Sequence, residues 1–233
     1  MITIVTPVYN GEEYIKECIA SIQNQQYSNY EHIIVDGKST DNTLDIVEQY
    51  KDDHIKIISE KDNGMYDAIK KGFEMANGEI YAWLNADDTY LPWAFRIMNY
   101  AMKQKVDWCT CMNGFQDTMG IFKFSDLYYY KREWIRKGYY NGRVLRFIQQ
   151  ESTFWTRELF QRVNAGEIIS HYMMAGDFAL WRAFARYAPL YSMPTAIAGF
   201  RVHSGQKSSD MSKYYEEIKG NISEYKKFFI IIK

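Results

Sequence analysis

The chain has 233 residues, of which 47% are hydrophobic and 17% aromatic, and its formal net charge is −1. A chain of this length buries roughly two-thirds or more of the surface it exposes when unfolded, so one catalytic domain can fold without disulfides or structural metals. The near-zero net charge and the lack of a long basic run argue against a protein that binds nucleic acid.

The cysteines and the first residues indicate the compartment. Cys18, Cys109 and Cys111 form neither an even set nor a C-x-x-C pair, so they predict no disulfide framework and no zinc site. The chain opens on the apolar run 2–5 without a basic region, and no apolar run reaches about 18 residues. We expect a chain of the reducing cytosol, neither exported through a signal peptide nor membrane-spanning.

The first ninety residues alternate between strand and helix patterns. The expected strands are 2–6, 32–35, 55–59 and 80–84. The expected helices are one carrying the apolar stripe of residues 14–22, one carrying Leu44 and Val47, and one over 65–76 that ends at Asn77-Gly78. Asn10 with Glu13 resembles a capping box for the first helix, and Thr40 or Asp41 is expected to cap the second.

This alternation predicts an α/β fold with right-handed crossovers, a mostly parallel central sheet and flanking helices. In such sheets, ligands bind at the carboxyl ends of the strands. Acidic residues follow the expected strands at those ends, namely Asp36, Asp62, Asp87 and Asp88.

The second half is less periodic. Helices are expected over 92–103, 156–163 and 176–187, and the tail 214–233 reads as a helix ending in the apolar patch 228–232. The aromatic and basic stretch 128–134 is expected in a loop or short helix. No repeat, low-complexity tract or linker indicates a second domain.

Two common nucleotide-binding motifs fail. Gly37-Lys38-Ser39-Thr40 looks like the end of a P-loop, but His32 stands where that motif needs its first glycine. No G-x-G-x-x-G follows any expected strand. Nucleotide binding would therefore use carboxylates and backbone groups.

Asn85-Ala86-Asp87-Asp88 directly follows the strand expected over 80–84. Two readings stay open: a turn or helix cap, and a site whose oxygens hold a hard cation at the strand end.

Several motifs occur in a fixed order: IVTPVYN at 4–10, IVDG at 34–37, STDNT at 39–43, WLNADD at 83–88, QQE at 149–151, GDF at 176–178 and RVH at 201–203. Together they resemble the family 2 glycosyltransferases of GT-A fold, of the bacterial surface-polysaccharide type. The resemblance covers about residues 1–208. It implies a nucleotide-binding half over 1–90, an acceptor and catalytic half over 91–208, and a helical tail over 209–233.

The resemblance also implies which residues bind the donor and a metal ion. Asn85 replaces the usual first aspartate of the family's D-x-D motif, so Asp87 would hold Mn²⁺ or Mg²⁺ together with the donor's phosphates and His203. The expected nucleotide and donor residues are Thr6, Pro7, Tyr9, Asp36, Gly37, Asp62, Asn85 and Ala86.

Asp177 matches the catalytic aspartate of the family, and its alternative role is a helix N-cap. An inverting transfer needs a base that removes the proton of the acceptor hydroxyl, and burial among apolar neighbours would make this carboxylate more basic. Gln150, Glu151 and Trp181 are expected at the acceptor or donor sugar, although the first two also fit a structural hydrogen-bonded pair.

The resemblance implies an inverting, metal-dependent hexosyltransferase that moves a sugar from a nucleoside diphosphate donor, a UDP-sugar first, to a hydroxyl of a glycan acceptor. It suggests a lipid-linked acceptor at the inner face of the cytoplasmic membrane, which 128–134 and 228–232 could touch. A contact within the core or with a second copy in a homodimer stays open for the tail.

Two rival functions stay open. A nucleotidyltransferase would need a glycine-rich and basic loop after the first strand, and residues 7–11 lack one. A non-catalytic relative that binds a nucleotide or sugar would keep Asp36 and lose the base at Asp177.

Overall fold

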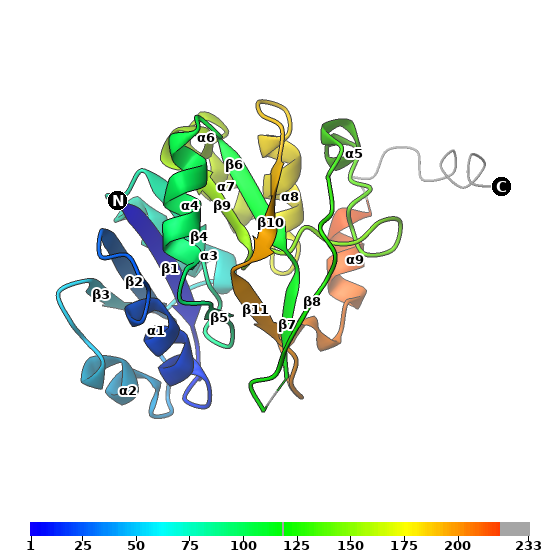
Figure 1. The fold of residues 1–233 in the computed structure, drawn as a ribbon. Helices are drawn as coiled ribbons and strands as arrows, with labels where there is room; N and C mark the ends of the chain where they lie inside the picture. The colour runs from blue at the N-terminus through cyan, green and yellow to red at the C-terminus, as the bar shows by residue number, and fades with distance from the viewer. Residues whose placement is uncertain (118, 220–233) are drawn as a thin grey trace.

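The computed structural model describes residues 1–117 and 119–219, and it is built around one large mixed sheet with a smaller sheet beside it (Figure 1). The large sheet has the strand order β10-β6-β9-β4-β1-β2-β3 and the small one β5-β11-β7-β8. The strands are β1 (Ile2–Val8), β2 (Tyr30–Asp36), β3 (Ile55–Ser59), β4 (Ile80–Trp83), β5 (Thr89–Tyr90), β6 (Trp108–Met112), β7 (Gly114–Gln116), β8 (Phe122–Phe124), β9 (Thr153–Thr156), β10 (Tyr191–Ala196) and β11 (Ala198–Arg201).

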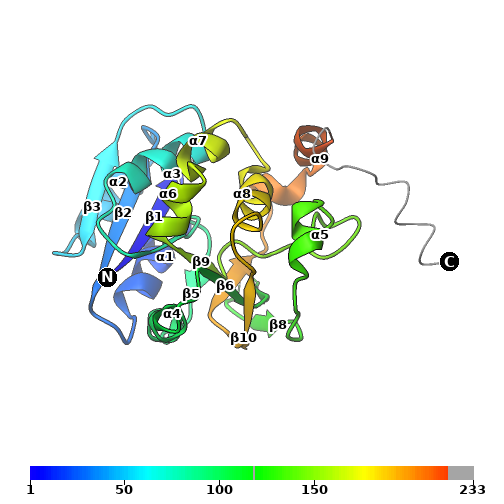
Figure 2. The same ribbon diagram turned by 90° about the horizontal axis from the view of Figure 1, so that it is seen from above.

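Helices cover both faces of the large sheet (Figure 2). They are α1 (Ile15–Gln23), α2 (Thr43–Gln49), α3 (Met65–Glu74), α4 (Ala94–Lys103), α5 (Arg132–Arg136), α6 (Arg157–Arg162), α7 (Ala165–Ser170), α8 (Gly176–Phe184) and α9 (Ser212–Ile218). Apolar residues of α1, α2 and α4 pack on one face, and those of α3, α6, α7 and α8 pack on the other.

The expected mostly parallel α/β sheet is confirmed. β1 pairs in parallel with β2 and β4, β2 with β3, and β6 with β10. β9 is the exception, since it lies between β4 and β6 and runs antiparallel to both. Neither β9 nor the small sheet was expected, because their strands have two to four residues and show too little alternation to predict.

Two expected element ends were wrong. β1 continues through Pro7 to Val8, because its pairing with β4 ends at Val5 and leaves one side where a residue without an N–H is tolerated. Asn10 does not cap α1. It adopts a left-handed backbone (φ 50°), and its side-chain oxygen accepts the Thr40 N–H at 2.8 Å, so it ties the loop after β1 to the loop after β2.

Other boundaries moved by a few residues. The helix expected over 92–103 begins at Ala94, and the one expected over 176–187 ends at Phe184. α2 begins at Thr43, whose N–H is accepted by Asp41, while Thr40 takes no part in its cap. A short helix, α5, forms within the stretch expected as loop or helix. The apolar patch 228–232 lies outside the described residues, and the division at residue 90 stays a prediction.

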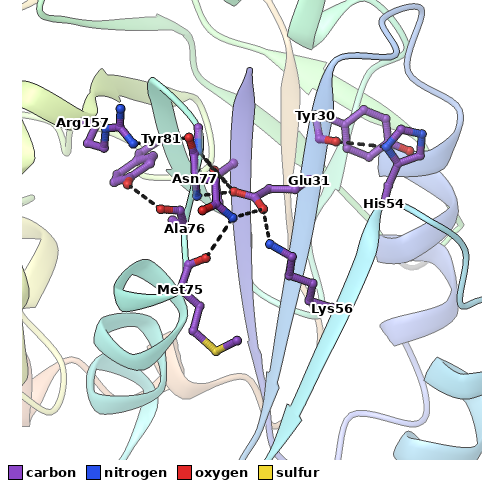
Figure 3. Close-up of polar contacts among 11 residues, drawn as sticks. Tyr30, Glu31, His54, Lys56, Met75, Ala76, Asn77, Tyr81 and Arg157 are labelled. Atoms are coloured by element: carbon purple, nitrogen blue, oxygen red, sulfur yellow. Dashed lines mark hydrogen bonds and ion pairs between the residues drawn. The ribbon is translucent and has the colours of Figure 1, made fainter.

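A buried carboxylate, that of Glu31, lies at the amino-terminal end of the parallel strands. Glu31 of β2 is 5% exposed and accepts hydrogen bonds from Lys56 Nζ (2.6 Å), Thr3 Oγ1 (2.7 Å) and Asn77 Nδ2 (3.2 Å), as Figure 3 shows for Lys56 and Asn77. Burial alone would raise the pKa of Glu31, but these bonds outweigh it and lower the pKa to about 2. We call this group, with Gly78 as a further donor, the Glu31 network.

The three cysteines are free and buried. Over the residues described, no helix is both long enough and apolar enough to cross a bilayer.

Candidate functional site

Two cavities adjoin at the carboxyl ends of β1 and β4, as expected for a parallel sheet. The first cavity has a volume of about 580 Å³ and the second about 560 Å³. Both are lined by Met65, Asn85, Asp87, Gln206 and Lys207. A molecule in one cavity can therefore meet a molecule in the other across this shared wall.

The first cavity gathers many of the expected donor residues. Pro7 and Tyr9 come from the end of β1 and the loop after it, and Asp62 precedes α3. The Asp62 carboxylate accepts the Gly64 N–H at 2.8 Å. Gly37 fits against Asp62, because a Cβ at position 37 would stand 2.5 Å from Asp62 Oδ2.

Asp87 and His203 meet at the first cavity although 116 residues separate them, with His203 Nε2 lying 3.1 Å from Asp87 Oδ2. Arg201 holds this region together. Its Nε donates to the Asp87 carbonyl at 2.7 Å and its N–H donates to Asp88 Oδ1 at 2.9 Å. The Tyr14 ring packs against both the Arg201 guanidinium and the His203 ring.

Asn85 presents an acceptor without a partner. Its Nδ2 donates to Asp88 Oδ2 at 3.4 Å, while its Oδ1 is buried and has no hydrogen-bond partner among the described residues. Burial and the neighbouring charges of Asp87 and Glu151 raise the pKa of the Asp88 carboxyl well above its usual range. Asp88 therefore accepts a hydrogen bond from the backbone of Arg201, and Asp87 is the carboxylate that faces the cavity.

These residues fit a divalent cation only in part. Asp87 offers a carboxylate, His203 an imidazole nitrogen and Asn85 the unpartnered oxygen, which are ligand types that Mn²⁺ and Mg²⁺ accept. No cluster of three or more His, Cys, Asp or Glu side chains suited to a metal occurs in the described part of the chain. A metal ion here would take its remaining ligands from a bound substrate.

The second cavity contains Asp177, the second residue of α8 and not its N-cap. Burial raises the pKa of Asp177 to about 6, against the opposing hydrogen bonds from the Phe178 N–H and the Tyr66 hydroxyl. The Tyr66 hydroxyl lies 3.4 Å from Asp177 Oδ1 and accepts the Asp177 N–H at 3.1 Å. Gly176 permits this approach, since a Cβ there would stand 2.7 Å from the Tyr66 ring.

Gln150 and Glu151 also line the second cavity. Gln150 Nε2 donates to the Trp83 carbonyl, which leaves its Oε1 buried without a partner among the described residues. Glu151 is 2% exposed, and its Oε1 is likewise unpartnered over the described part of the chain. Burial and the nearby charges of Asp177 and Asp87 raise the pKa of Glu151 to about 8, so this side chain is mostly neutral at pH 7.

Four expected site residues, namely Thr6, Asp36, Gly37 and Trp181, lie outside both cavity linings. Thr6 faces inward, with its hydroxyl 2.9 Å from His32 Nε2. Asp36 is fully buried, and its carboxylate accepts from Ser59 Oγ at 2.7 Å and from the Ser39 N–H at 3.0 Å, so it organises the loop after β2. Trp181 is 3% exposed and stacks between Trp83 and Trp108, which makes it a core residue and corrects its expected role at a sugar.

Sequence reasoning missed several residues that build the site. Tyr66 holds Asp177, and Gln206 and Lys207 line both cavities. Glu217 of α9 accepts the backbone N–H groups of Met173, Met174 and Ala175 at 2.8, 3.0 and 2.8 Å, directly before α8. A signal existed only for Tyr66, which stands on the apolar stripe of α3.

Curated relatives resemble this chain. An uncharacterized glycosyltransferase of Haemophilus influenzae is 29% identical over 222 residues, which are 90% of this chain and 68% of that protein. A Bacillus subtilis protein that carries the name of a teichuronic acid biosynthesis glycosyltransferase, TuaG, is 37% identical over 93 residues, 39% of this chain and 37% of its own length.

Solved structures share the fold. S. aureus TarS 1–349 in complex with UDP-GlcNAc has a TM-score of 0.73 at 17% identity, covering 94% of this chain and 64% of that one. The mannosyltransferase PcManGT from Pyrobaculum calidifontis, in complex with GDP-Man and Mn²⁺, has a TM-score of 0.64 at 17% identity, covering 94% and 60%. The chain thus spans less than two-thirds of each, and the expected GT-A fold is confirmed.

The family profile described as "Glycosyl transferase family 2" matches residues 3–166, which include β1 to β4, the loop at Asn85 and Asp87, and Glu151. This match covers well over half of the chain. The chain therefore belongs to glycosyl transferase family 2.

Proposed function

We propose that this chain is an inverting, metal-dependent hexosyltransferase that moves a sugar from a nucleoside diphosphate donor, with a UDP-sugar as the first candidate, to a hydroxyl of a glycan acceptor. The observation that carries the proposal is the pair of adjoining cavities with Asp87 and His203 at the first and Asp177 at the second. The donor would occupy the first cavity and the acceptor the second, so that the reacting atoms meet at the shared wall.

In this proposal Asp177 removes the proton of the acceptor hydroxyl as that oxygen attacks the anomeric carbon. Its raised pKa of about 6 leaves it mostly ionised at pH 7 and more basic than an exposed aspartate. Tyr66 orients the carboxylate. Asp87 and His203, with Asn85 beside them, would hold Mn²⁺ or Mg²⁺, which would offset the charge that develops on the departing diphosphate.

The bound complexes of TarS and PcManGT support a nucleotide-sugar donor, and PcManGT supports a manganese ion. The name of TuaG supports a role in cell-surface polysaccharide synthesis. We propose that the protein acts in the cytoplasm, at the inner face of the membrane, where such acceptors would be presented.

The proposal is tested by calorimetric titration of UDP, GDP and dTDP into the protein with and without Mn²⁺, repeated on Asp87→Ala. We expect Mn²⁺-dependent binding of UDP that is lost in the variant. Asp107→Ala is the control, since Asp107 lines neither cavity. Binding of none of the three nucleotides would instead support a non-catalytic relative or an unusual donor.

A further inference from the structure

The helix that carries Asp177 has no side-chain cap of its own. The residue before α8 is Ala175, which has no polar side-chain atom to accept a hydrogen bond. The first N–H groups of a helix find no partner within the helix, so an acceptor must come from elsewhere. It comes from Glu217 of α9, 42 residues further along the chain, whose Oε2 accepts the Ala175 N–H at 2.8 Å. The same carboxylate accepts the N–H groups of Met173 and Met174.

This segment before α8 is tied to Asp177 on its other side. The Tyr66 hydroxyl donates to the Met174 carbonyl at 3.2 Å or to Asp177 Oδ1 at 3.4 Å. It also accepts the Asp177 N–H at 3.1 Å. The hydrogen bonds therefore form a continuous path from α9 to Asp177, with Met174 and Tyr66 as its intermediates.

Apolar packing gives α9 a fixed place against α8. Phe178 of α8 is buried in one cluster with Tyr214 and Ile218 of α9, and the ring centroids of Phe178 and Tyr214 are 6.4 Å apart. Glu217 stands between these two anchors of α9 and is partly buried. Glu216, the preceding residue of the same helix, is exposed. The packing thus directs one of two adjacent glutamates to the start of α8.

The charge of Glu217 also acts on Asp177. Burial raises the pKa of Asp177, and the negative charge of Glu217 adds to that rise. The other titratable groups that interact with Asp177 are Tyr66, Tyr214 and Glu151. Burial raises the pKa of both tyrosines, so they stay neutral at pH 7, and Glu151 is mostly neutral there. Removing the Glu217 charge should therefore lower the pKa of Asp177.

We propose that Glu217 is a positioning residue for sugar transfer: its carboxylate fixes the start of α8 and thereby holds the Asp177 carboxylate at its place in the second cavity. This inference rests on the proposed function, in which Asp177 removes the proton of the acceptor hydroxyl. Glu217 lines neither cavity, so it acts through the backbone before α8 and not on a bound donor. A displacement of about 1 Å in a reacting group can lower a rate about a hundredfold.

The first test observes Asp177 directly, by NMR titration of protein labelled with ¹³C at the aspartate carboxyl carbons, with Asp177→Asn to assign the signal. Glu217→Gln removes the charge and keeps the length of the side chain. We expect the midpoint of the Asp177 titration to lie at lower pH in this variant than in the wild type. Glu216→Gln is the matched control, because it removes the same charge from the exposed neighbour, and its midpoint should equal that of the wild type.

The second test is the release of UDP from UDP-GlcNAc, a donor of the proposed class, with Mn²⁺ present and water as the acceptor. Glu217→Ala should lower kcat by about ten- to a hundredfold and leave the KM of the donor within about twofold of the wild type. Glu217→Gln should lie between them, because its amide oxygen can still accept the Met174 and Ala175 N–H groups. If Glu217→Ala does not fold, Glu217→Gln decides. Glu216→Ala should behave as the wild type.

An Asp177 midpoint that is equal in the wild type and Glu217→Gln, or a kcat unchanged in the folded Glu217 variants, would overturn the inference and leave the proposed function intact. A fall in kcat that Glu216→Ala shares would overturn it as well. If the wild type releases no UDP, the titration of Asp177 decides the inference by itself. If the wild type also fails to bind UDP, it is the proposed function that fails.

Discussion

Two buried glutamates at opposite ends of the sheet have pKa values that are shifted in opposite directions. Glu31 at the amino-terminal edge and Glu151 at the carboxyl-terminal cavity are 5% and 2% exposed, yet their pKa values move to about 2 and about 8. Glu31 has donors on both carboxylate oxygens, whereas Glu151 Oε1 lacks a partner among the described residues. Both side chains are buried, so their hydrogen-bond partners decide whether the pKa falls or rises.

The two ends of the sheet therefore differ in role. The Glu31 network joins β1, β2, β3 and the turn before β4, so it contributes to stability. At the other end, unpartnered oxygens of Asn85, Gln150 and Glu151 cost stability and are available to a ligand. The variants at Asp177 and Glu31 change one end of the sheet and test whether the other responds, and those at Gly176 and Glu151 test single groups of the carboxyl-terminal end.

The largest expected effect is on turnover. Asp177→Asn should lower turnover by about 10² to 10⁴, because a positioned base contributes about that factor. UDP affinity should stay unchanged, and the midpoint of thermal unfolding should stay equal or rise, since the substitution removes a buried charge. Donor turnover and calorimetry measure the two effects, and unchanged turnover would remove Asp177 from the mechanism.

Glu31→Gln should lower the free energy of unfolding at pH 7 by about 1.5 to 3 kcal/mol, because hydrogen bonds to a charged group contribute about that much. The pKa is lowered in the folded state, so this stabilisation is present above about pH 4.5 and lost as the pH falls toward 2. Urea unfolding at several pH values measures it.

Nucleotide binding by folded Glu31→Gln should match that of the wild type. Glu133→Gln is the control, because Glu133 pairs with Arg136 on the surface, where an ion pair contributes little. A weaker UDP affinity in Glu31→Gln alone would show that the two ends are not independent.

Gly176→Ala should push Tyr66 away from Asp177, because the added Cβ would stand 2.7 Å from the Tyr66 ring. We expect turnover to fall about tenfold, equivalent to about 1.4 kcal/mol, with a change in the acid limb of its pH profile. Gly166→Ala, whose Cβ would meet only the Lys70 side chain at 3.3 Å, serves for comparison. Equal turnover in both variants would separate Tyr66 from the function of Asp177.

Glu151→Gln should change the slope of stability against pH. Because the pKa of Glu151 is raised in the folded state, wild-type stability falls as the pH rises from about 4.5 to 8. The amide variant should lose that slope. Parallel curves for the two proteins across this range would show that Glu151 ionises normally.

The sequence predicted the first half of the fold well. The four parallel strands and their helices have strong apolar periodicity, and the motifs around Asn85, Asp177 and His203 located residues that the structure brings to two adjoining cavities. Thr6 and Asp36 belong to the motifs at 4–10 and 34–37, but they face inward to His32 and Ser59, because a one-residue step along a strand reverses the side chain.

The remainder could not be predicted for physical reasons. Trp181 carries the same apolar signal whether it stacks in the core or lines a cavity. Lys207 and Glu217 act through backbone carbonyl and N–H groups near Met173, and a contact with backbone leaves no residue pattern in the partner segment.

The segment after β11 is synthesised after all the strands and supplies residues of the site. His203, Gln206, Lys207, Tyr214 and Glu217 all follow Asp177 in the chain, and His203 emerges 116 residues after Asp87. A growing chain can form the first four strands long before these residues leave the ribosome. A polypeptide interrupted before residue 203 would contain every strand that the structure describes but would lack the residues that complete the two cavities.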